Sequence, residues 1–180
     1  MVAVIRSVNL NKNRMALSQS ARKTIEKEAN AILAELKITK PPVVASLLFS
    51  YIEKKFGPVV EAPISSGSIG NKKIEGFVQS GKGMFIIGWD AKREKSIQDY
   101  IKIHEVGHIL YNHGDSFRKS VGGYQNSEEI CDYFALCVVV NPKMLKRYWK
   151  INQNILSLAN IFETSPAYIS KMLSYQGLSN

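Results

Sequence analysis

The sequence predicts an α+β protein that is mainly helical and carries one small β-hairpin or sheet. Apolar residues recur at helical spacing in several long segments of the 180-residue chain. Between the second and third of these segments, two short β-rich runs flank a glycine-containing turn. Hydrophobic residues make up 45% of the chain, which is ample for the core of one domain.

The first part of the chain predicts two helices. Residues 1–13 are expected to form a loose arm. Ser18–Leu36 then carries apolar residues at helical spacing, and the helix breaks at Lys40-Pro41-Pro42. A second helix is expected over Pro42–Phe56, closed by Gly57-Pro58.

A short β region follows the second helix. Val59–Ala62 predicts a strand, and Ser65–Asn71 predicts a flexible turn. Lys73–Gln79 and Met84–Gly88 flank Ser80-Gly-Lys-Gly83, which is typical of a hairpin.

The segment Lys92–His113 predicts the helix that carries the most informative motif of the chain, His104-Glu105-Val106-Gly107-His108. On a helix, residues i and i+4 project from one face, so both imidazoles can reach one ion. A zinc ion held by two imidazoles and a third ligand keeps a place for water and lowers the pKa of that water toward about 7. Glu105 lies beside the first His and can take the proton of the water. The motif therefore predicts hydrolysis of amide bonds.

A motif with three fixed positions also arises by chance, and a lone His on an apolar face is usually a core residue. The chain has only three His, however, and all lie between positions 104 and 113. Two His with a Glu between them on a buried helix are difficult to place without a metal, because burial of polar groups without partners is costly. We therefore favour a metal site.

A third ligand is expected on the next helix, which Asn126–Val140 predicts with Ser127 as its N-cap. Glu128 and Asp132 are spaced i, i+4 and face the same way. A carboxylate at 128 completes the metal sphere, and Asp132 accepts the free ring N–H of a ligating His. Both Glu128 and Glu129 also suit the helix dipole. The register with Asp132 favours Glu128 as the ligand, with Glu129 as the alternative.

These segments resemble the ImmA/IrrE family of metallopeptidases. The resemblance rests on three stretches and extends over most of the chain, including the leading helices and the hairpin: His104-Glu-Val-Gly-His-Ile-Leu-Tyr-Asn-His113, Glu128-Glu-Ile-Cys-Asp-Tyr-Phe-Ala135 and Asn141-Pro142. It implies a zincin-like peptidase domain over residues 1–150. It further implies that His104, His108 and Glu128 are the zinc ligands and that Glu105 is the general base.

The chain departs from the family pattern at two positions. Cys131 replaces the usual Ala, which is one small residue for another, and Ile130 replaces an acid that is often present. The second change leaves Glu128 as the better match for the ligand. His113 matches a recurrent His just past the motif, and a cation at a helix end is an adequate explanation for it. Tyr124, in the loop before Glu128, either donates its hydroxyl to a developing oxyanion or simply anchors the loop.

The resemblance also implies a substrate class. Bacterial and phage proteins of the ImmA/IrrE family resemble proteases that cut a partner transcriptional repressor. We therefore expect a helix-turn-helix repressor as the substrate, and relief of repression in a phage, a mobile element or a stress response as the outcome. The spacing of residues by itself names no substrate.

Residues 151–180 predict a C-terminal helical appendage packed on the peptidase domain. Leu156–Leu173 has the pattern helix, tight turn, helix, with Ser165 as N-cap and Pro166 at the first helical position. Such a pair can place its second helix in the major groove of DNA. That helix has only Lys171 as a basic residue, so direct binding of nucleic acid is the less favoured interpretation.

Composition excludes some functions. The net charge of +9 suits either a well-solvated surface or attraction to an acidic partner or to nucleic acid, and no basic block is interleaved with aromatics. No apolar run reaches about 18 residues, so no membrane span is expected, and the N-terminal apolar stretch is too short for a signal peptide. Cys131 and Cys137 are expected to point to different sides of one helix and not to pair, which fits a cytoplasmic protein.

Two functions therefore compete on sequence grounds. The first is a zinc endopeptidase of gluzincin type. The alternative is a DNA- or protein-binding regulatory module with a structural metal site. Glu105 favours the first, because a structural site needs no base.

Overall fold

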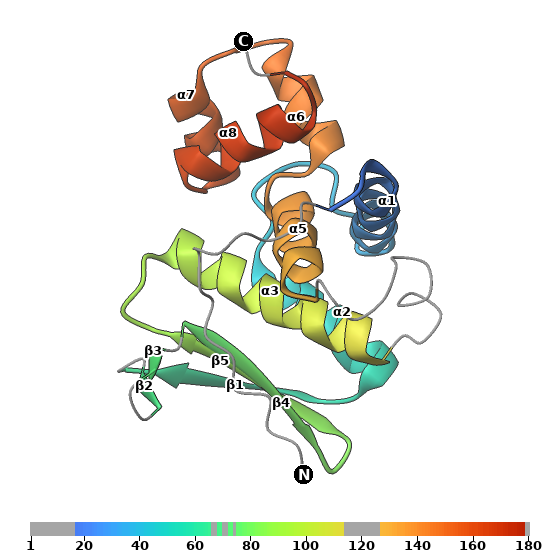
Figure 1. Cartoon of the computed structure of the whole chain (residues 1–180), viewed down its shortest axis with the longest axis vertical. Helices are drawn as coiled ribbons and strands as arrows, with labels where there is room; N and C mark the ends of the chain where they lie inside the picture. Colours follow the sequence, from blue (N-terminus) through green and yellow to red (C-terminus); the bar gives the residue numbers. More distant parts are fainter. Residues whose placement is uncertain (1–16, 66–67, 70–71, 74, 114–126, 179–180) are drawn as a thin grey trace.

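The computed structural model describes residues 17–65, 68–69, 72–73, 75–113 and 127–178. Within these residues the fold is α+β, with seven helices, a three-stranded mixed sheet and a separate pair of two-residue strands. Figure 1 shows α3 crossing the middle of the molecule, with the sheet on one side and α5 on the other. The predicted fold class is confirmed. The expected arm at residues 1–13 lies outside the described residues.

The helices follow the periodic segments of the sequence, with small shifts at their starts. Their bounds are α1 (Gln19–Glu35), α2 (Ala45–Phe56), α3 (Lys95–His113), α5 (Ser127–Val139), α6 (Pro142–Trp149), α7 (Ile155–Phe162) and α8 (Pro166–Tyr175). The second helix begins at Ala45 and not at Pro42, because Val44 is still extended. The third begins at Lys95 and not at Lys92, because Asp90 Oδ1 accepts the Lys92 N–H in a turn that precedes the helix.

Asn141 starts a helix, α6, that the sequence analysis did not separate from its neighbours. Its side-chain oxygen accepts the backbone N–H groups of Lys143 and Met144, and Pro142 occupies the first helical position. Its amide nitrogen donates to Asn30 Oδ1 of α1 and to the Cys137 carbonyl of α5. One buried side chain therefore ends α5, begins α6 and holds both to α1.

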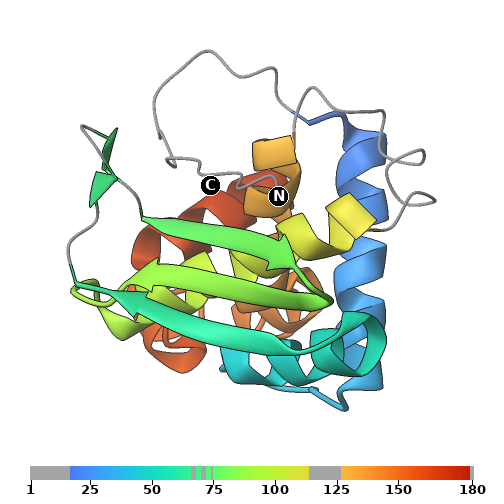
Figure 2. The same ribbon diagram turned by 90° about the horizontal axis from the view of Figure 1, so that it is seen from below.

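The main sheet has the strand order β1-β5-β4. The strands are β1 (Val59–Ile64), β4 (Gly76–Gly81) and β5 (Met84–Asp90). The hairpin β4–β5 is antiparallel, as predicted, while β1 pairs in parallel with β5, so β5 is central and β4 lies at an edge. Figure 2 looks onto the three strands with helices behind them.

The flexible turn predicted at residues 65–71 is wrong in part. Ser68–Ile69 forms β2, which pairs with β3 at Lys72–Lys73 in an antiparallel ladder. Lys73 therefore belongs to this small pair, and the main hairpin begins only at Gly76. The pairing satisfies backbone N–H and C=O groups that a flexible turn would leave to water.

The C-terminal helices share one hydrophobic core with the rest of the chain. Buried Leu158 and Phe162 of α7, and Ile169, Met172 and Leu173 of α8, belong to the same cluster as the buried residues of α1, α3 and α5. A shared core does not test the predicted domain boundary near residue 150, so this boundary stays a prediction. Among the described residues, no helix is both long enough and apolar enough to cross a bilayer.

The contact between α3 and α5 is unusually close at Gly107. A Cβ atom built at this position would lie 3.2 Å from both Cβ and Sγ of Cys131. Glycine costs helix stability, by roughly 1 kcal/mol relative to Ala. Here that cost is offset by the approach of α5, which a larger residue would push away.

We expect Gly107→Val to lower the free energy of unfolding by about 1–3 kcal/mol, because an added isopropyl group must enter a contact that Cys131 already fills. Urea denaturation of the metal-free protein measures this. Gly107→Ala is the matched control, since the gain in helix propensity opposes a smaller clash. A Val variant as stable as the wild type would show that the two helices do not depend on this contact.

Candidate metal centre

Three side chains from two helices converge on one point. His104 and His108 lie one turn apart on α3, and their Nε2 atoms are 3.1 Å apart. Glu128, in the first turn of α5, places one carboxylate oxygen 3.5 Å from His104 Nε2 and the other 3.5 Å from His108 Nε2. These three residues form a group that can hold a metal ion. These are the three ligands expected from the motif, the helical spacing and the family resemblance.

The geometry of the group fits a small divalent ion. Tetrahedral zinc with ligand bonds of about 2.0–2.1 Å places neighbouring ligand atoms roughly 3.3 Å apart. The observed separations of 3.1 and 3.5 Å bracket this value. Two imidazole nitrogens and a carboxylate are also a donor set that zinc accepts, and they leave a fourth position for another ligand. Glu129, the alternative acid, is not part of the group.

Asp132 holds the first imidazole from its other side. His104 Nδ1 lies 2.9 Å from Asp132 Oδ1, within ion-pair distance, while the other ring nitrogen, Nε2, faces His108 and Glu128. Asp132 lies one turn after Glu128 on α5, so one helix face supplies both carboxylates. The expected contact between Asp132 and a ligating His is therefore present.

Hydrogen bonding shifts the pKa values of His104 and Glu128 in opposite directions. Burial opposes charge on His104, but hydrogen bonds with Asp132 and Glu128 outweigh burial and raise the pKa of His104 to about 10. Burial likewise opposes charge on Glu128, but hydrogen bonds from the two imidazoles hold the pKa of its carboxyl well below the usual range. Without a metal the group is therefore a partly buried ion pair, and a metal must displace a proton to enter it.

Glu105 is buried next to the metal group but is not one of its members. Its carboxylate lies against the edge strand β4, since a Cβ atom on Gly76 would come within 2.9 Å of Glu105 Oε1. Gly76 is thus needed to leave room for this carboxylate. Burial raises the pKa of Glu105, although the two nearby imidazoles oppose the shift.

Two further contacts were missed in the sequence. The Tyr100 hydroxyl donates to the Asp132 carbonyl at 3.0 Å and lies 3.5 Å from Asp132 Oδ1. Cys131 Sγ lies 3.4 Å from His108 Nδ1. Helical spacing could have indicated both, because Tyr100 precedes His104 by one turn and Cys131 follows Glu128 by three residues.

Two other residues singled out from the sequence are not tested by the structure. Tyr124 lies outside the described residues. His113 ends α3, and its side chain also lies outside the described part of the chain. Cys131 and Cys137 are both buried and do not form a disulfide with each other, as the sequence predicted.

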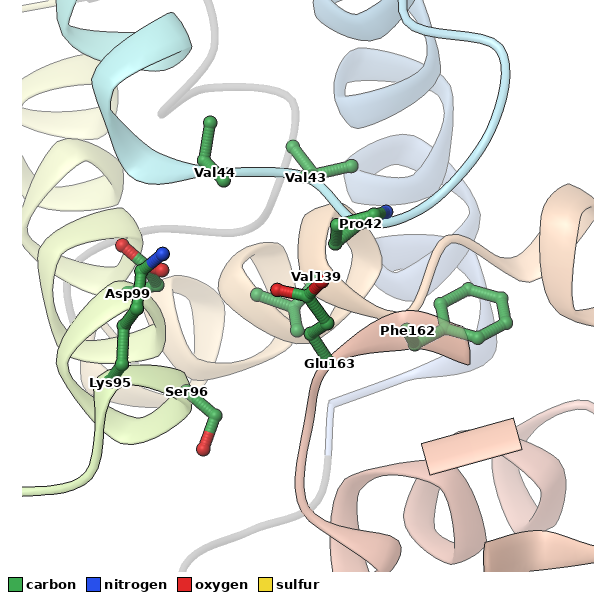
Figure 3. A pocket seen from close by; sticks show the side chains of 9 residues that line it. All are labelled: Pro42, Val43, Val44, Lys95, Ser96, Asp99, Val139, Phe162 and Glu163. Carbon is green, nitrogen blue, oxygen red and sulfur yellow. The ribbon is translucent and has the colours of Figure 1, made fainter. Parts of the chain in front are cut away.

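A cavity of about 170 Å³ lies away from the metal group, between the start of α3 and the segment that leads into α2. Figure 3 shows Lys95 and Asp99 on one side of it and Pro42 and Val43 on another. The Asp99 carboxylate accepts a hydrogen bond from the backbone N–H of Ala45, and burial raises the pKa of this acid. The N-cap residue of α2, Val44, has no side-chain oxygen, so Asp99 supplies a carboxylate at this helix end instead. We therefore assign Asp99 a structural role.

Comparison of the chain with protein-family models and with curated proteins finds no match. Among solved structures, the chain is similar to a Mycobacterium tuberculosis transcriptional regulator, with a TM-score of 0.57 and 11% sequence identity. The similarity covers 86% of this chain and 51% of the regulator, so this chain spans about half the length of that protein. At this identity the likeness concerns the fold alone.

We expect Glu128→Gln to weaken zinc binding by more than the roughly 100-fold that loss of an outer-shell partner can cost, because a neutral amide replaces a charged ligand. Titration against a chromophoric chelator measures this. Glu129→Gln is the matched control and should cost only about 0.3–1 kcal/mol of helix-dipole stabilisation. The reverse order would show that the neighbouring acid is the ligand.

The imidazole of His104 should titrate far above the ordinary value of about 6.5 in the metal-free protein, with a midpoint near 10. Because the folded pKa is raised, this group stabilises the metal-free fold fully below pH 6.5 and loses that effect as the pH rises through about 10. NMR titration of the ring C–H resonances measures the midpoint. In Asp132→Asn the midpoint should fall, and an unchanged midpoint would contradict the role of Asp132.

Proposed function

We propose that this protein is a zinc-dependent endopeptidase that cleaves a partner transcriptional repressor. The observation that carries the proposal is a group of three candidate metal ligands with a fourth polar residue beside it. That residue, Glu105, is a buried carboxylate that is not one of the three ligands. Structural zinc sites are usually closed by four protein ligands, whereas catalytic sites use three and keep one position open. Zinc bound in such a site lowers the pKa of water and polarises a carbonyl oxygen.

In this proposal each residue of the group has one task. His104, His108 and Glu128 would hold the ion through the nitrogen and oxygen atoms that already converge. Asp132 orients His104 through the 2.9 Å contact with Nδ1, and Tyr100 holds Asp132 in turn. Outer contacts of this kind fix the tautomer of the imidazole and increase its basicity as a ligand.

Glu105 is proposed as the general base. It takes a proton from the attacking water and passes that proton to the nitrogen of the leaving amine.

The edge strand β4 supports an extended peptide as the substrate. Among the described residues β4 pairs only with β5, and it lies against Glu105 at Gly76. An extended segment can add to such an edge through backbone hydrogen bonds, which recognise a peptide with little regard to its sequence. A peptide bound there passes close to the proposed base.

The identity of the partner rests on two weaker supports. The sequence resembles the ImmA/IrrE metallopeptidases, and the fold is similar to that of a Mycobacterium tuberculosis transcriptional regulator. Both supports suggest a role in transcriptional control. We therefore propose a helix-turn-helix repressor, cut in an exposed linker, so that repression is relieved in a phage, a mobile element or a stress response.

A second candidate function is a DNA- or protein-binding module with a structural metal site. The pattern of α7 and α8 and the net charge of +9 favour it. Two observations weigh against it. A structural site needs no base, yet Glu105 is buried at 4% exposure. Helix α8 carries Lys171 as its one basic residue, and its Tyr168 is stacked on the core residue Tyr100.

We expect Glu105→Gln to retain zinc and the fold but to lower the cleavage rate by about 10²–10⁴-fold, because the water then lacks a base. Co-expression with candidate helix-turn-helix repressors, followed by electrophoresis, measures cleavage. Zinc content and the melting temperature establish that the variant is otherwise intact.

His104→Ala should lose both zinc and cleavage, and Glu53→Gln, an exposed acid on α2, should lose neither. If wild type and Glu105→Gln both leave the repressor intact and relieve repression equally, the protein acts by binding and the second candidate is correct.

A further inference from the structure

A small cavity of about 70 Å³ adjoins the metal group, and part of its wall comes from the C-terminal helix. His104 and Asp132 line one part of it. Tyr168 and Lys171 of α8 line another, although they lie more than 60 positions further along the chain than His104. The C-terminal helix is therefore part of the surroundings of the metal group.

We propose that this cavity is the subsite that receives the substrate side chain next to the scissile bond, and that α8 makes it selective for aliphatic side chains. The inference rests on the proposed endopeptidase function and deepens it. Neither the motif nor the donor geometry assigns a role to α8.

The lining of the cavity is mainly apolar. Ile97 and Ile101 of α3 contribute aliphatic groups, and Tyr100 and Tyr168 contribute their rings. Its volume is about half of the roughly 150 Å³ that holds a benzene molecule. An aliphatic side chain of three or four carbons suits this space, whereas an indole ring does not.

The charges around the cavity disfavour a basic side chain. Its two carboxylates are already paired, Glu75 with Arg93 and Asp132 with His104. Lys171 is exposed and brings a positive charge to the rim. A Lys or Arg side chain of the substrate would meet repulsion without a free carboxylate to offset it.

The wall formed by α8 is held by specific contacts. The Tyr168 ring stacks on Tyr100 with centroids 4.3 Å apart and an interplanar angle of 21°. At the other end of the helix, Gln176 donates to Glu26 of α1 at 2.9 Å. Because Tyr100 also binds Asp132, the helix is connected both to the core and to the metal group. A wall fixed in this way can select by size.

The test uses the zinc-loaded full-length protein and four thiol compounds. Each is an amide whose α-carbon carries a sulfanylmethyl group and one variable group. The variable group is hydrogen, isobutyl, aminobutyl or indolylmethyl. The thiol binds zinc in the open position, and calorimetry measures affinity without any cleavage. The isobutyl compound should bind about 10- to 150-fold more tightly than the hydrogen compound, from burial of one aliphatic side chain. The aminobutyl and indolylmethyl compounds should show no such gain.

Three variants test whether the gain in affinity arises in the cavity. Ile97→Phe fills the space, so the isobutyl advantage should vanish while the hydrogen compound binds within twofold of its wild-type affinity. Ile155→Phe, at the start of α7 and outside the cavity lining, is the matched control and should keep the advantage. Tyr168→Ala removes the wall of α8 and should let the indolylmethyl compound bind at least tenfold more tightly.

The outcomes separate the two proposals. If the hydrogen compound does not bind although zinc is present, the open position is absent, and both the endopeptidase and its subsite are wrong. If it binds but isobutyl gives no gain, or the gain survives Ile97→Phe, the subsite proposal is wrong and the endopeptidase proposal stands. If Tyr168→Ala leaves the preference for size unchanged, α8 does not set it.

Discussion

The close approach of α3 and α5 is the constraint on which the rest of this structure depends. His104 and His108 come from one helix, and Glu128 and Asp132 come from the other, so the group exists only while the two helices stay in register. Gly107 permits this approach at its contact with Cys131. A displacement of about 1 Å would separate ligand atoms that must all reach one ion.

The group is placed in a core where unpaired charge is costly. Two imidazoles facing each other at 3.1 Å would destabilise a core that offered no acid. Glu128 and Asp132 compensate by hydrogen bonding, and they do so in the orientation that aims both Nε2 atoms at one point. Buried ion pairs of this kind seldom add stability compared with apolar residues of equal size. The arrangement is therefore better explained by ion binding than by stability.

The β-sheet and the C-terminal helices complete the surroundings of the group from opposite directions. Strand β4 lies against Glu105, where Gly76 leaves space for the carboxylate. Helix α8 contacts α3 through the stacked rings of Tyr100 and Tyr168, and it lines a cavity beside His104. A helix pair that resembles a DNA-reading motif in sequence is thus joined to the proposed catalytic site in the fold.

The sequence by itself determined those features in which one helix, one strand pair or one cap places both partners. The spacing of His104 and His108, the pairing in register of Glu128 with Asp132, the hairpin and the cap at Ser165 are local, because one backbone geometry places both members of each pair. Only the tertiary structure decided which of Glu128 and Glu129 joins the group, that β1 pairs in parallel with β5, and that Tyr168 reaches Tyr100. These contacts join segments that local periodicity does not relate, and they depend on how side chains pack where the segments meet.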